Sequence, residues 1–276
     1  MVQDQINRFL RDNCGFDEFR SVLEGDATYS DSVWRGLSEM GVQGTAIPSA
    51  YGGVEAGYLS LCLAARELGA HLAPVPFSSS IYLAAEAIQR TGSEVQKEEW
   101  LPKLASGQVI GTLAVTETVQ EQVPEDITTT FAKGKLNGIK LVVPHGLMAD
   151  VAVVLARTSD GLSLVLAPLS DVMRKSIDTV DPTMGSATIT LKDAPAELLG
   201  ESHDGWSAMS AAYNLAALLF AFEHAGGAER ALDLAVGCAK HRSACVVPIC
   251  SFQALNTLHP DISFATNAAA PTCAHA

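Results

Sequence analysis

The spacing of hydrophobic residues changes twice along the chain. Over residues 1–108 the spacing is helical, and in 58–72 apolar side chains recur every three or four positions. Further helices are predicted over 80–89 and over 94–104. Pro102 is expected to interrupt the last of these, because proline lacks the amide donor that a helix interior uses.

Between about residues 109 and 200 the pattern is typical of short β-strands. Asn137-Gly138 stands between two extended runs, which predicts the turn of a hairpin. A second hairpin is predicted where a loop around Asp160 separates two apolar runs. The expected strands are 109–116, 151–156, 162–167 and 187–191.

From Gly205 the pattern becomes helical again. One long helix is predicted over 206–239, although Gly226-Gly227 weakens its middle. A weaker helix is expected over 251–267. The most hydrophobic stretch, 215–222, lies in an uncharged run that contains serines and an asparagine and lacks basic flanks. This favours a buried core helix over a membrane span.

Helices, strands and helices therefore follow one another in separate blocks. This order predicts an α+β fold. The expected domains are an N-terminal helical domain (1–108), a middle antiparallel β-barrel or β-sandwich (109–203) and a C-terminal helical region (204–276). Such an order by itself indicates no activity.

Composition and charge narrow the class of protein. The chain has 276 residues, of which 48% are hydrophobic and 18% charged, and this excludes a disordered chain. The formal net charge is −13, which makes nucleic acid a poor partner because its phosphates are repelled. The N-terminal residues are polar and charged, unlike a secretory signal, so a cytoplasmic protein is expected.

Six cysteines are present, and four thiol or imidazole groups lie close together in the sequence, at Cys238, His241, Cys245 and Cys250. Such groups can bind zinc, but their spacing matches no common zinc site. Small cysteines of an apolar core are the favoured interpretation, with reduced thiols and no metal site.

The familiar sequence signatures of nucleophiles and phosphate-binding loops are missing. The pairs Gly52-Gly53 and Gly226-Gly227 are interpreted as turn or packing residues. Glu223 and His224 are titratable neighbours, but adjacent helical residues point in different directions. Both are therefore expected to be surface or hydrogen-bonded residues.

Several segments, taken together and in order, resemble the acyl-CoA dehydrogenase family. They are 48–53 with Glu67-Leu68-Gly69, then Gly92-Ser93 with 97–107, then 109–117 ending in Ala114-Val115-Thr116-Glu117, then Asn137-Gly138-Ile139-Lys140, then 149–157, and finally Arg242, Pro248-Ile249 and Phe252-Gln253. The resemblance covers nearly the whole chain. It implies the family order of helices, β-barrel and helical bundle.

The resemblance also implies FAD chemistry on an acyl-CoA thioester. In this family the flavin accepts a hydride from the β-carbon while a carboxylate removes the α-proton. By the same resemblance, Thr116 and the Val115 backbone would contact the flavin ring. Arg242 would meet the FAD pyrophosphate across a subunit interface, and Gln253 would lie on the cofactor side.

The chain also departs from the family pattern. The loop at 118–126 differs, Val142 and Pro144 replace an aromatic residue and a hydroxyl residue, and Cys245-Val246 replaces Phe-Gly. One family position for the catalytic glutamate, next to an arginine on the long helix, holds Ala216-Ala217. The alternative carboxylate loop would come after Ala276, so the helical bundle is expected to be shortened and no catalytic residue is assigned.

These two sets of observations predict a degenerate subunit of a hetero-oligomeric acyl-CoA dehydrogenase. Some members of the family that act on bulky or steroid side-chain thioesters pair such a subunit with a catalytic one. FAD would then be shared with the partner. A scaffold or acyl-CoA-binding protein on the same fold is the main alternative, followed by an active homo-oligomer with an unconventional base and by the product of a decaying gene.

Overall fold

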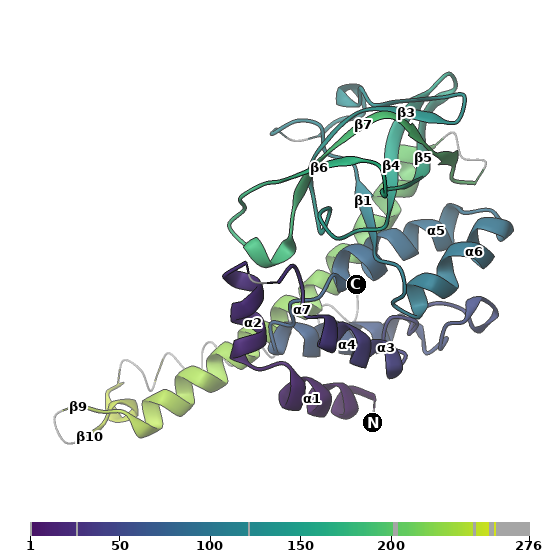
Figure 1. The fold of residues 1–276 in the computed structure, drawn as a ribbon. Coiled ribbons are helices and arrows are strands. Elements are labelled where there is room, and N and C mark those ends of the chain that lie inside the picture. The colour runs from purple at the N-terminus through teal and green to yellow at the C-terminus, as the bar shows by residue number, and fades with distance from the viewer. Residues whose placement is uncertain are drawn as a thin grey trace.

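The computed structural model describes residues 2–25, 27–120, 122–200, 204–244, 247–253 and 257. Helices come first and pack beneath a β-sheet, and one long helix follows the sheet (Figure 1). The elements before the sheet are α1 (Val2–Asn13), α2 (Phe16–Leu23), α3 (Asp31–Glu39), the 3-10 turn η1 (Ser49–Tyr51), α4 (Gly57–Ala70), the π-helical segment η2 (Ser78–Ala85), α5 (Glu86–Thr91) and α6 (Glu94–Ala105).

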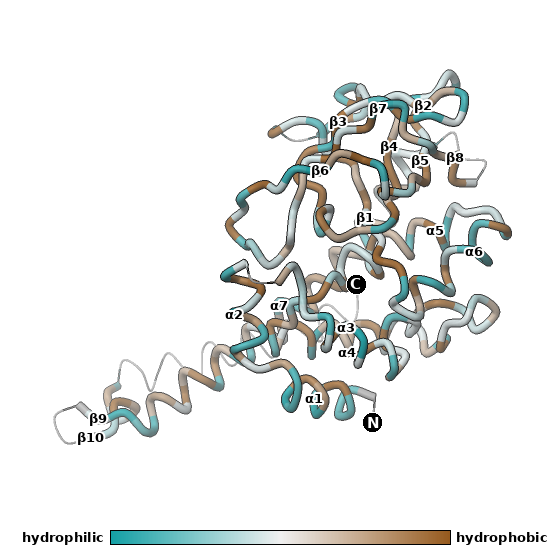
Figure 2. The backbone as a smooth tube through the Cα atoms, in the orientation of Figure 1, coloured by the Kyte–Doolittle hydropathy of each residue, from teal (hydrophilic) through white to brown (hydrophobic). Residues whose placement is uncertain are grey.

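The helix predicted over 58–72 is α4, and the helices predicted over 80–89 and 94–104 correspond to η2 with α5 and to α6. Polar and hydrophobic residues alternate along peripheral helices such as α1, where Ile6 and Leu10 are buried one turn apart (Figure 2). The Ser93 side chain caps α6 through a capping box with Gln96.

The expected interruption at Pro102 is wrong, because α6 continues to Ala105. Proline removes a single donor here, and the buried Leu101 and Leu104 on either side hold the last turn against the core. The helix then ends within one turn, with the Ser106 amide donating to the Pro102 carbonyl.

The sheet contains eight strands in the order β6-β7-β3-β2-β4-β5-β8, with β1 also paired to β4. Most neighbours are antiparallel, whereas β1 and β2 each run parallel to β4. The middle region is thus one mixed sheet rather than a purely antiparallel one. Its strands are β1 (Gly111–Ala114), β2 (Thr130–Ala132), β3 (Lys135–Val143), β4 (Val151–Thr158), β5 (Gly161–Pro168), β6 (Met173–Ser176), β7 (Ala187–Pro195) and β8 (Glu197–Leu198).

One predicted hairpin turn is confirmed and the other is misplaced. Strands β4 and β5 join at Ser159-Asp160, as expected. Asn137-Gly138, however, lies inside β3, and the turn between β2 and β3 falls at Lys133-Gly134, where φ is 52° and 74°. Gly138 is needed for a different reason: a Cβ there would stand 2.3 Å from Thr129 Oγ1.

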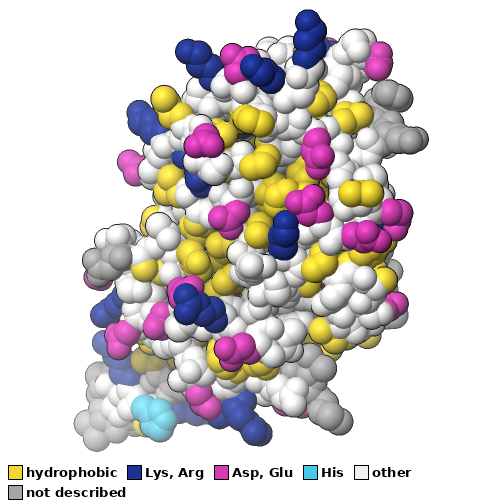
Figure 3. Space-filling model, turned by 45° about the vertical axis from the view of Figure 1, so that its right-hand side comes forward, with side chains coloured by type: hydrophobic (Ala, Val, Ile, Leu, Met, Phe, Trp, Pro, Cys, Tyr) yellow, Lys and Arg dark blue, Asp and Glu magenta, His cyan; other side chains and the backbone are white. Residues whose placement is uncertain are grey.

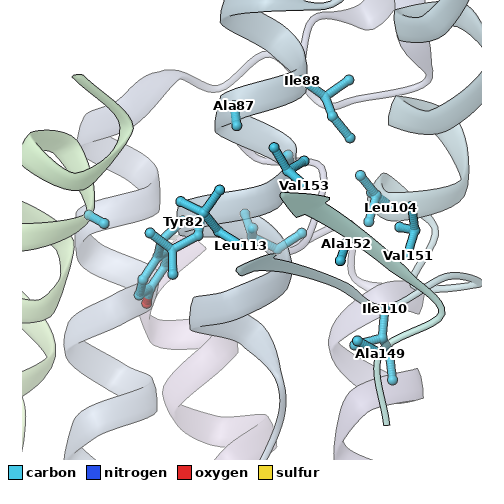
Figure 4. Close-up of a cluster of buried hydrophobic side chains, with 14 of the residues drawn as sticks. Tyr82, Ala87, Ile88, Leu104, Ile110, Leu113, Ala149, Val151, Ala152 and Val153 are labelled. Carbon is cyan, nitrogen blue, oxygen red and sulfur yellow. The ribbon is translucent and has the colours of Figure 1, made fainter. Parts of the chain in front are cut away.

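The core lies where the sheet meets the helices. Strands β1 and β4 pack against η2, α5 and α6, and their apolar side chains interlock with Ile88 and Leu104 (Figure 4). Tyr82 also belongs to this cluster, and its ring stacks edge-to-face with Phe77 and Phe220. On the face drawn in Figure 3, hydrophobic side chains gather across the middle, with acidic and basic residues interspersed around them.

The long helix predicted over 206–239 is α7 (Gly205–His241), which crosses α4. Glycine permits the close approach: a Cβ on Gly69 would stand 1.9 Å from the Glu223 carbonyl, and one on Gly226 1.9 Å from the Arg66 carbonyl. The packing interpretation of Gly226 is therefore confirmed. By length and composition α7 could also cross a membrane, although 33% of its apolar window is buried against the rest of the chain.

Beyond α7 lie the short strands β9 (Ser243–Ala244) and β10 (Val247–Pro248) and the turn η5 (Ile249–Ser251). They stand at the projecting end of α7, away from the sheet (Figure 1). The helix predicted over 251–267 falls mostly outside the described residues.

Candidate functional site

Val115 and Thr116 directly follow β1, at its carboxyl end. Val115 is buried, and its carbonyl accepts a hydrogen bond from Lys140 Nζ at 3.0 Å. Thr116 is half-buried, and its carbonyl accepts from the Leu141 amide at 2.7 Å. Among the described residues the Thr116 hydroxyl has no hydrogen-bond partner, so it is free to meet a ligand.

Glu117 and Lys140 form a buried ion pair behind Thr116. Their side chains are 5% and 0% exposed, and Lys140 Nζ lies 2.6 Å from Glu117 Oε1. Lys140 also donates to the Leu155 carbonyl at 2.6 Å, and Glu117 accepts from Thr128 and Thr129. Every hydrogen of the ammonium group thus has an acceptor, and the contact with the Val115 carbonyl anchors the backbone next to Thr116.

The pKa values of the pair follow from this environment. Burial alone would raise the pKa of Glu117, but the hydrogen bonds from Lys140, Thr128 and Thr129 outweigh it and lower the pKa to about 2. Burial lowers the pKa of Lys140 to about 8, against the opposing attraction of Glu117. Both groups are charged at neutral pH, and their role is to position the end of β1.

The segment from Val142 to His145, next to Thr116, has an unusual backbone. Val142 adopts φ 48° at a bulge in the β3–β7 pairing, and its side chain is 50% exposed. A positive φ is strained for a β-branched residue and is often found beside functional sites. The Pro144 carbonyl accepts from Thr112 Oγ1 at 2.7 Å, so this replacement contributes backbone contacts instead of a hydroxyl.

Arg242 and Gln253 lie at the other end of the molecule. Arg242 follows the last residue of α7 and is exposed, and its carbonyl accepts from the Ile249 amide at 2.9 Å. Gln253 follows η5 and is also exposed. The structure thus brings Val115 and Thr116 together at one place and Arg242 and Gln253 together at another, with most of α7 between them (Figure 1).

A cavity of about 450 Å³ opens where the η2 end of the helical layer, α7 and the lower loops of the sheet meet. It has apolar walls, and Ser78, His145, Asp181, Thr183 and Glu223 bring polar groups into it. Its volume lies in the range of small-molecule pockets. Sequence reasoning missed this site, because its residues come from five separate segments.

His224 is exposed as expected, and Glu223 lies partly buried beside the Tyr82 hydroxyl, in agreement with the expectation of a surface or hydrogen-bonded residue. Glu223 lines the cavity, and burial raises its pKa to about 7. The adjacent Tyr82 hydroxyl acts in the opposite direction, and Asp181 raises the pKa further. A carboxyl group that lies in a cleft and has a pKa near neutral pH is a candidate functional group.

The cysteines are reduced among the described residues. Cys14 and Cys62 are buried as expected, but Cys238 is exposed and Cys250 partly exposed, so the core interpretation is wrong for these two. Cys245 lies outside the described residues. Within those that are described, no three histidine, cysteine or acidic side chains are placed to hold a metal ion.

Comparison with known proteins shows which family the chain resembles. Residues 1–108 match the model of the acyl-CoA dehydrogenase N-terminal domain. An acyl-CoA dehydrogenase from Bacillus subtilis is 29% identical over 92% of this chain and 72% of its own length. Residues 1–108 thus carry an acyl-CoA dehydrogenase N-terminal domain, and the chain is similar over most of its length to acyl-CoA dehydrogenases. Isovaleryl-CoA dehydrogenase from Bos taurus is 36% identical, but over 51% of this chain and 33% of its own length.

Solved acyl-CoA dehydrogenase structures share the fold. A variant of the Tcur3481-Tcur3483 steroid ACAD has a TM-score of 0.83 at 26% identity, covering 96% of this chain and 73% of that one. The ChsE4-ChsE5 complex from Mycobacterium tuberculosis has a TM-score of 0.83 at 25% identity, covering 97% and 76%. A glutaryl-CoA dehydrogenase from Mycobacterium smegmatis in complex with FADH2 has a TM-score of 0.88 at 24% identity, covering 99% and 73%.

Proposed function

We propose that this chain is a subunit of an FAD-dependent complex that introduces an α,β double bond into an acyl-CoA thioester. It acts with a partner acyl-CoA dehydrogenase subunit that supplies the catalytic carboxylate, and FAD is shared between them. A bulky acyl group, such as a steroid side chain, is the proposed substrate class. The observation that carries this proposal is the separation of Thr116 from Arg242.

Two chains are needed because these residues lie at different ends of one. Helix α7 begins against β5, where Gly205 packs on Ser163, and at 1.5 Å per residue its 37 residues span about 55 Å. Thr116 belongs to the sheet at the start of this span and Arg242 to its projecting end. If both meet flavin, Arg242 of this chain reaches the flavin of the partner.

The chemistry divides between cofactor and protein. FAD supplies the two-electron acceptor when it is bound. The Thr116 hydroxyl offers a hydrogen bond to the polar edge of a flavin ring, and the exposed Arg242 guanidinium offers a bidentate contact to a pyrophosphate. Gln253 adds an amide on the same side as Arg242.

This chain provides no base at the family positions on α7. Ala216 is buried and Ala217 exposed, and neither can accept a proton. The steroid and complex-forming structures named above are consistent with a partner, because the ChsE4-ChsE5 structure is described as a complex of two components.

Co-expression tests the proposal directly. The chain is produced with a full-length acyl-CoA dehydrogenase encoded beside it, and the purified material is examined by size-exclusion chromatography and by visible absorbance. We expect co-purification and a flavin spectrum that requires both chains. Separate elution of the two chains, or a flavin content that is independent of this chain, would contradict the proposal.

Matched variants separate flavin sharing from simple association. Arg242→Ala is expected to lower flavin content while the complex stays assembled. Lys240→Ala removes a neighbouring exposed charge at the same end of α7 and should leave flavin content unchanged. Thr116→Val should loosen flavin, whereas Thr130→Val on β2 should not.

A flavin-free acyl-CoA-binding protein is the second candidate. The cavity and the alanines at 216 and 217 favour it, since a binding protein needs a pocket but no base. Such a protein would give a colourless complex that still binds acyl-CoA, and the same absorbance measurement distinguishes the two.

A further inference from the structure

The cavity described above is built from parts of the chain that are distant in sequence. Helix α2, the segment between α4 and η2, the 3-10 turn η4 (Pro182–Met184) and α7 meet around it, and η4 lies against α2 (Figure 1). The apolar side of its lining includes Leu68, Leu72, Val75, Phe77 and Met184. The polar groups named above complete the lining.

One of these polar groups has a buried atom without a protein partner. His145 is 2% exposed, and its Nδ1 has no hydrogen-bond partner among the described residues. Buried polar atoms without partners are uncommon, and at the wall of a cavity they indicate a bound polar atom.

The charges around the cavity restrict what that atom can be. Among the described residues no lysine or arginine lines it, and the Asp181 carboxylate would repel a carboxylate or phosphate. Asp181 is already engaged, since its Oδ1 accepts from the Thr183 amide at 3.0 Å and from the Thr183 hydroxyl at 2.5 Å. Burial disfavours the ionised forms of Glu223 and His145, so these two side chains favour an uncharged ligand group. A neutral group that both donates and accepts suits the site best.

We propose that the cavity binds an acyl group whose apolar carbon skeleton carries a hydroxyl group, held by Glu223 and His145. This deepens the proposed function, on which the thioester part of the ligand rests. A hydroxyl can donate to one of these side chains while it accepts from the other, and the rest of an alicyclic skeleton lies against the apolar side. The site thus selects hydroxylated over deoxygenated acyl groups.

The test compares two CoA thioesters that differ by one hydroxyl: those of lithocholic acid and of cholanic acid. Binding to the purified full chain, alone and in its complex, is measured by isothermal titration calorimetry. We expect wild type to prefer the hydroxylated thioester by about tenfold or more. Equal affinities, no binding of either thioester, or tighter binding of the 3-amino analogue would overturn the proposal.

Three variants identify the residues responsible. Glu223→Leu should abolish the preference by weakening the hydroxylated ligand while the affinity of the deoxy ligand stays the same or increases. Glu223→Gln keeps a donor and an acceptor in nearly the same volume, folds even if the leucine variant does not, and should retain part of the preference. Asp233→Leu changes an exposed carboxylate on the same helix but outside the cavity, and it should leave the preference for the hydroxylated thioester intact. A preference that survives in both Glu223 variants would overturn the assignment.

The outcome remains distinguishable from that of the proposed function. Discrimination between the two thioesters is a binding measurement that needs neither flavin nor turnover. If hydroxyl discrimination persists while no flavin complex forms, the cavity assignment stands and the dehydrogenase-subunit proposal fails. If the flavin complex forms but both thioesters bind equally, the subunit proposal stands and the cavity assignment fails.

Discussion

Two regions of this molecule bury ionisable groups, and they do so in opposite ways. Behind Thr116, Lys140 and Glu117 are enclosed by partners, and the Lys140 ammonium donates to three acceptors. Around the cavity, Glu223 and His145 line the wall, and His145 Nδ1 has no hydrogen-bond partner among the described residues. The first pair finds its hydrogen-bond partners within the chain and holds the backbone in place, whereas the cavity residues gain a further partner only when a ligand enters.

The largest expected effect comes from breaking the pair of Lys140 and Glu117. Lys140→Met leaves Glu117 buried without its cation and should lower the free energy of unfolding by about 3–5 kcal/mol, measured by urea denaturation. The double variant Lys140→Met with Glu117→Leu removes both charges and should recover most of the loss. A single variant as stable as wild type would show that the pair is not needed to hold β1.

The pH dependence of stability should differ in sign between the regions. Glu223 has a folded pKa raised from 4.5 to about 7, so the folded state binds more protons than the unfolded state in this interval and stability falls as pH rises through it. Glu223→Gln should therefore gain up to about 3 kcal/mol over wild type between pH 4.5 and 8. Glu117, with its pKa lowered to about 2, adds stability that is complete above pH 4.5 and lost as pH falls toward 2. Denaturation curves across pH 2–8 check both, and a Glu223→Gln advantage that is independent of pH would contradict the burial of its carboxyl.

A third test concerns the helix crossing that places Glu223. Gly226→Ala puts a Cβ 1.9 Å from the Arg66 carbonyl, which must separate α4 from α7 and should cost about 1–3 kcal/mol. Gly237→Ala on the same helix meets nothing within 4 Å and should instead stabilise by up to about 1 kcal/mol. Thermal unfolding of both variants checks this prediction. Similar losses of stability in the two variants would refute the close crossing of α4 and α7.

The smallest effect is expected at the bulge beside Thr116. Val142→Gly relieves a positive φ of 48° and should stabilise the protein by about 1 kcal/mol or less. Val143→Gly, at the next and buried position, removes core packing and should destabilise it. Thermal melting of the two variants compares them, and a shift of the same sign in both would argue against strain at Val142.

The sequence predicted much of the fold but less of the candidate site. Helices α4 and α7 and the β4–β5 hairpin follow from local spacing and turn residues, which report the three or four positions around each residue. The turn predicted at Asn137-Gly138 was wrong for the same reason. This dipeptide favours a turn when only its neighbours in sequence are considered, but it lies inside β3, where Gly138 allows the close approach of Thr129. The place of Glu223 in the cavity wall was not predicted, because the cavity depends on α4 and η4, whose positions no local pattern reveals.

By itself, the sequence determined the order of helices, sheet and helix, and the resemblance to the acyl-CoA dehydrogenase family, because both are written in neighbouring residues. Only the tertiary structure decided which charges are paired and which face a cavity. It also decided that Arg242 lies far from Thr116, because α7 begins at the sheet and extends away from it to Arg242. These outcomes depend on contacts between segments distant in the chain, and such contacts exist only once the helices and the sheet have packed.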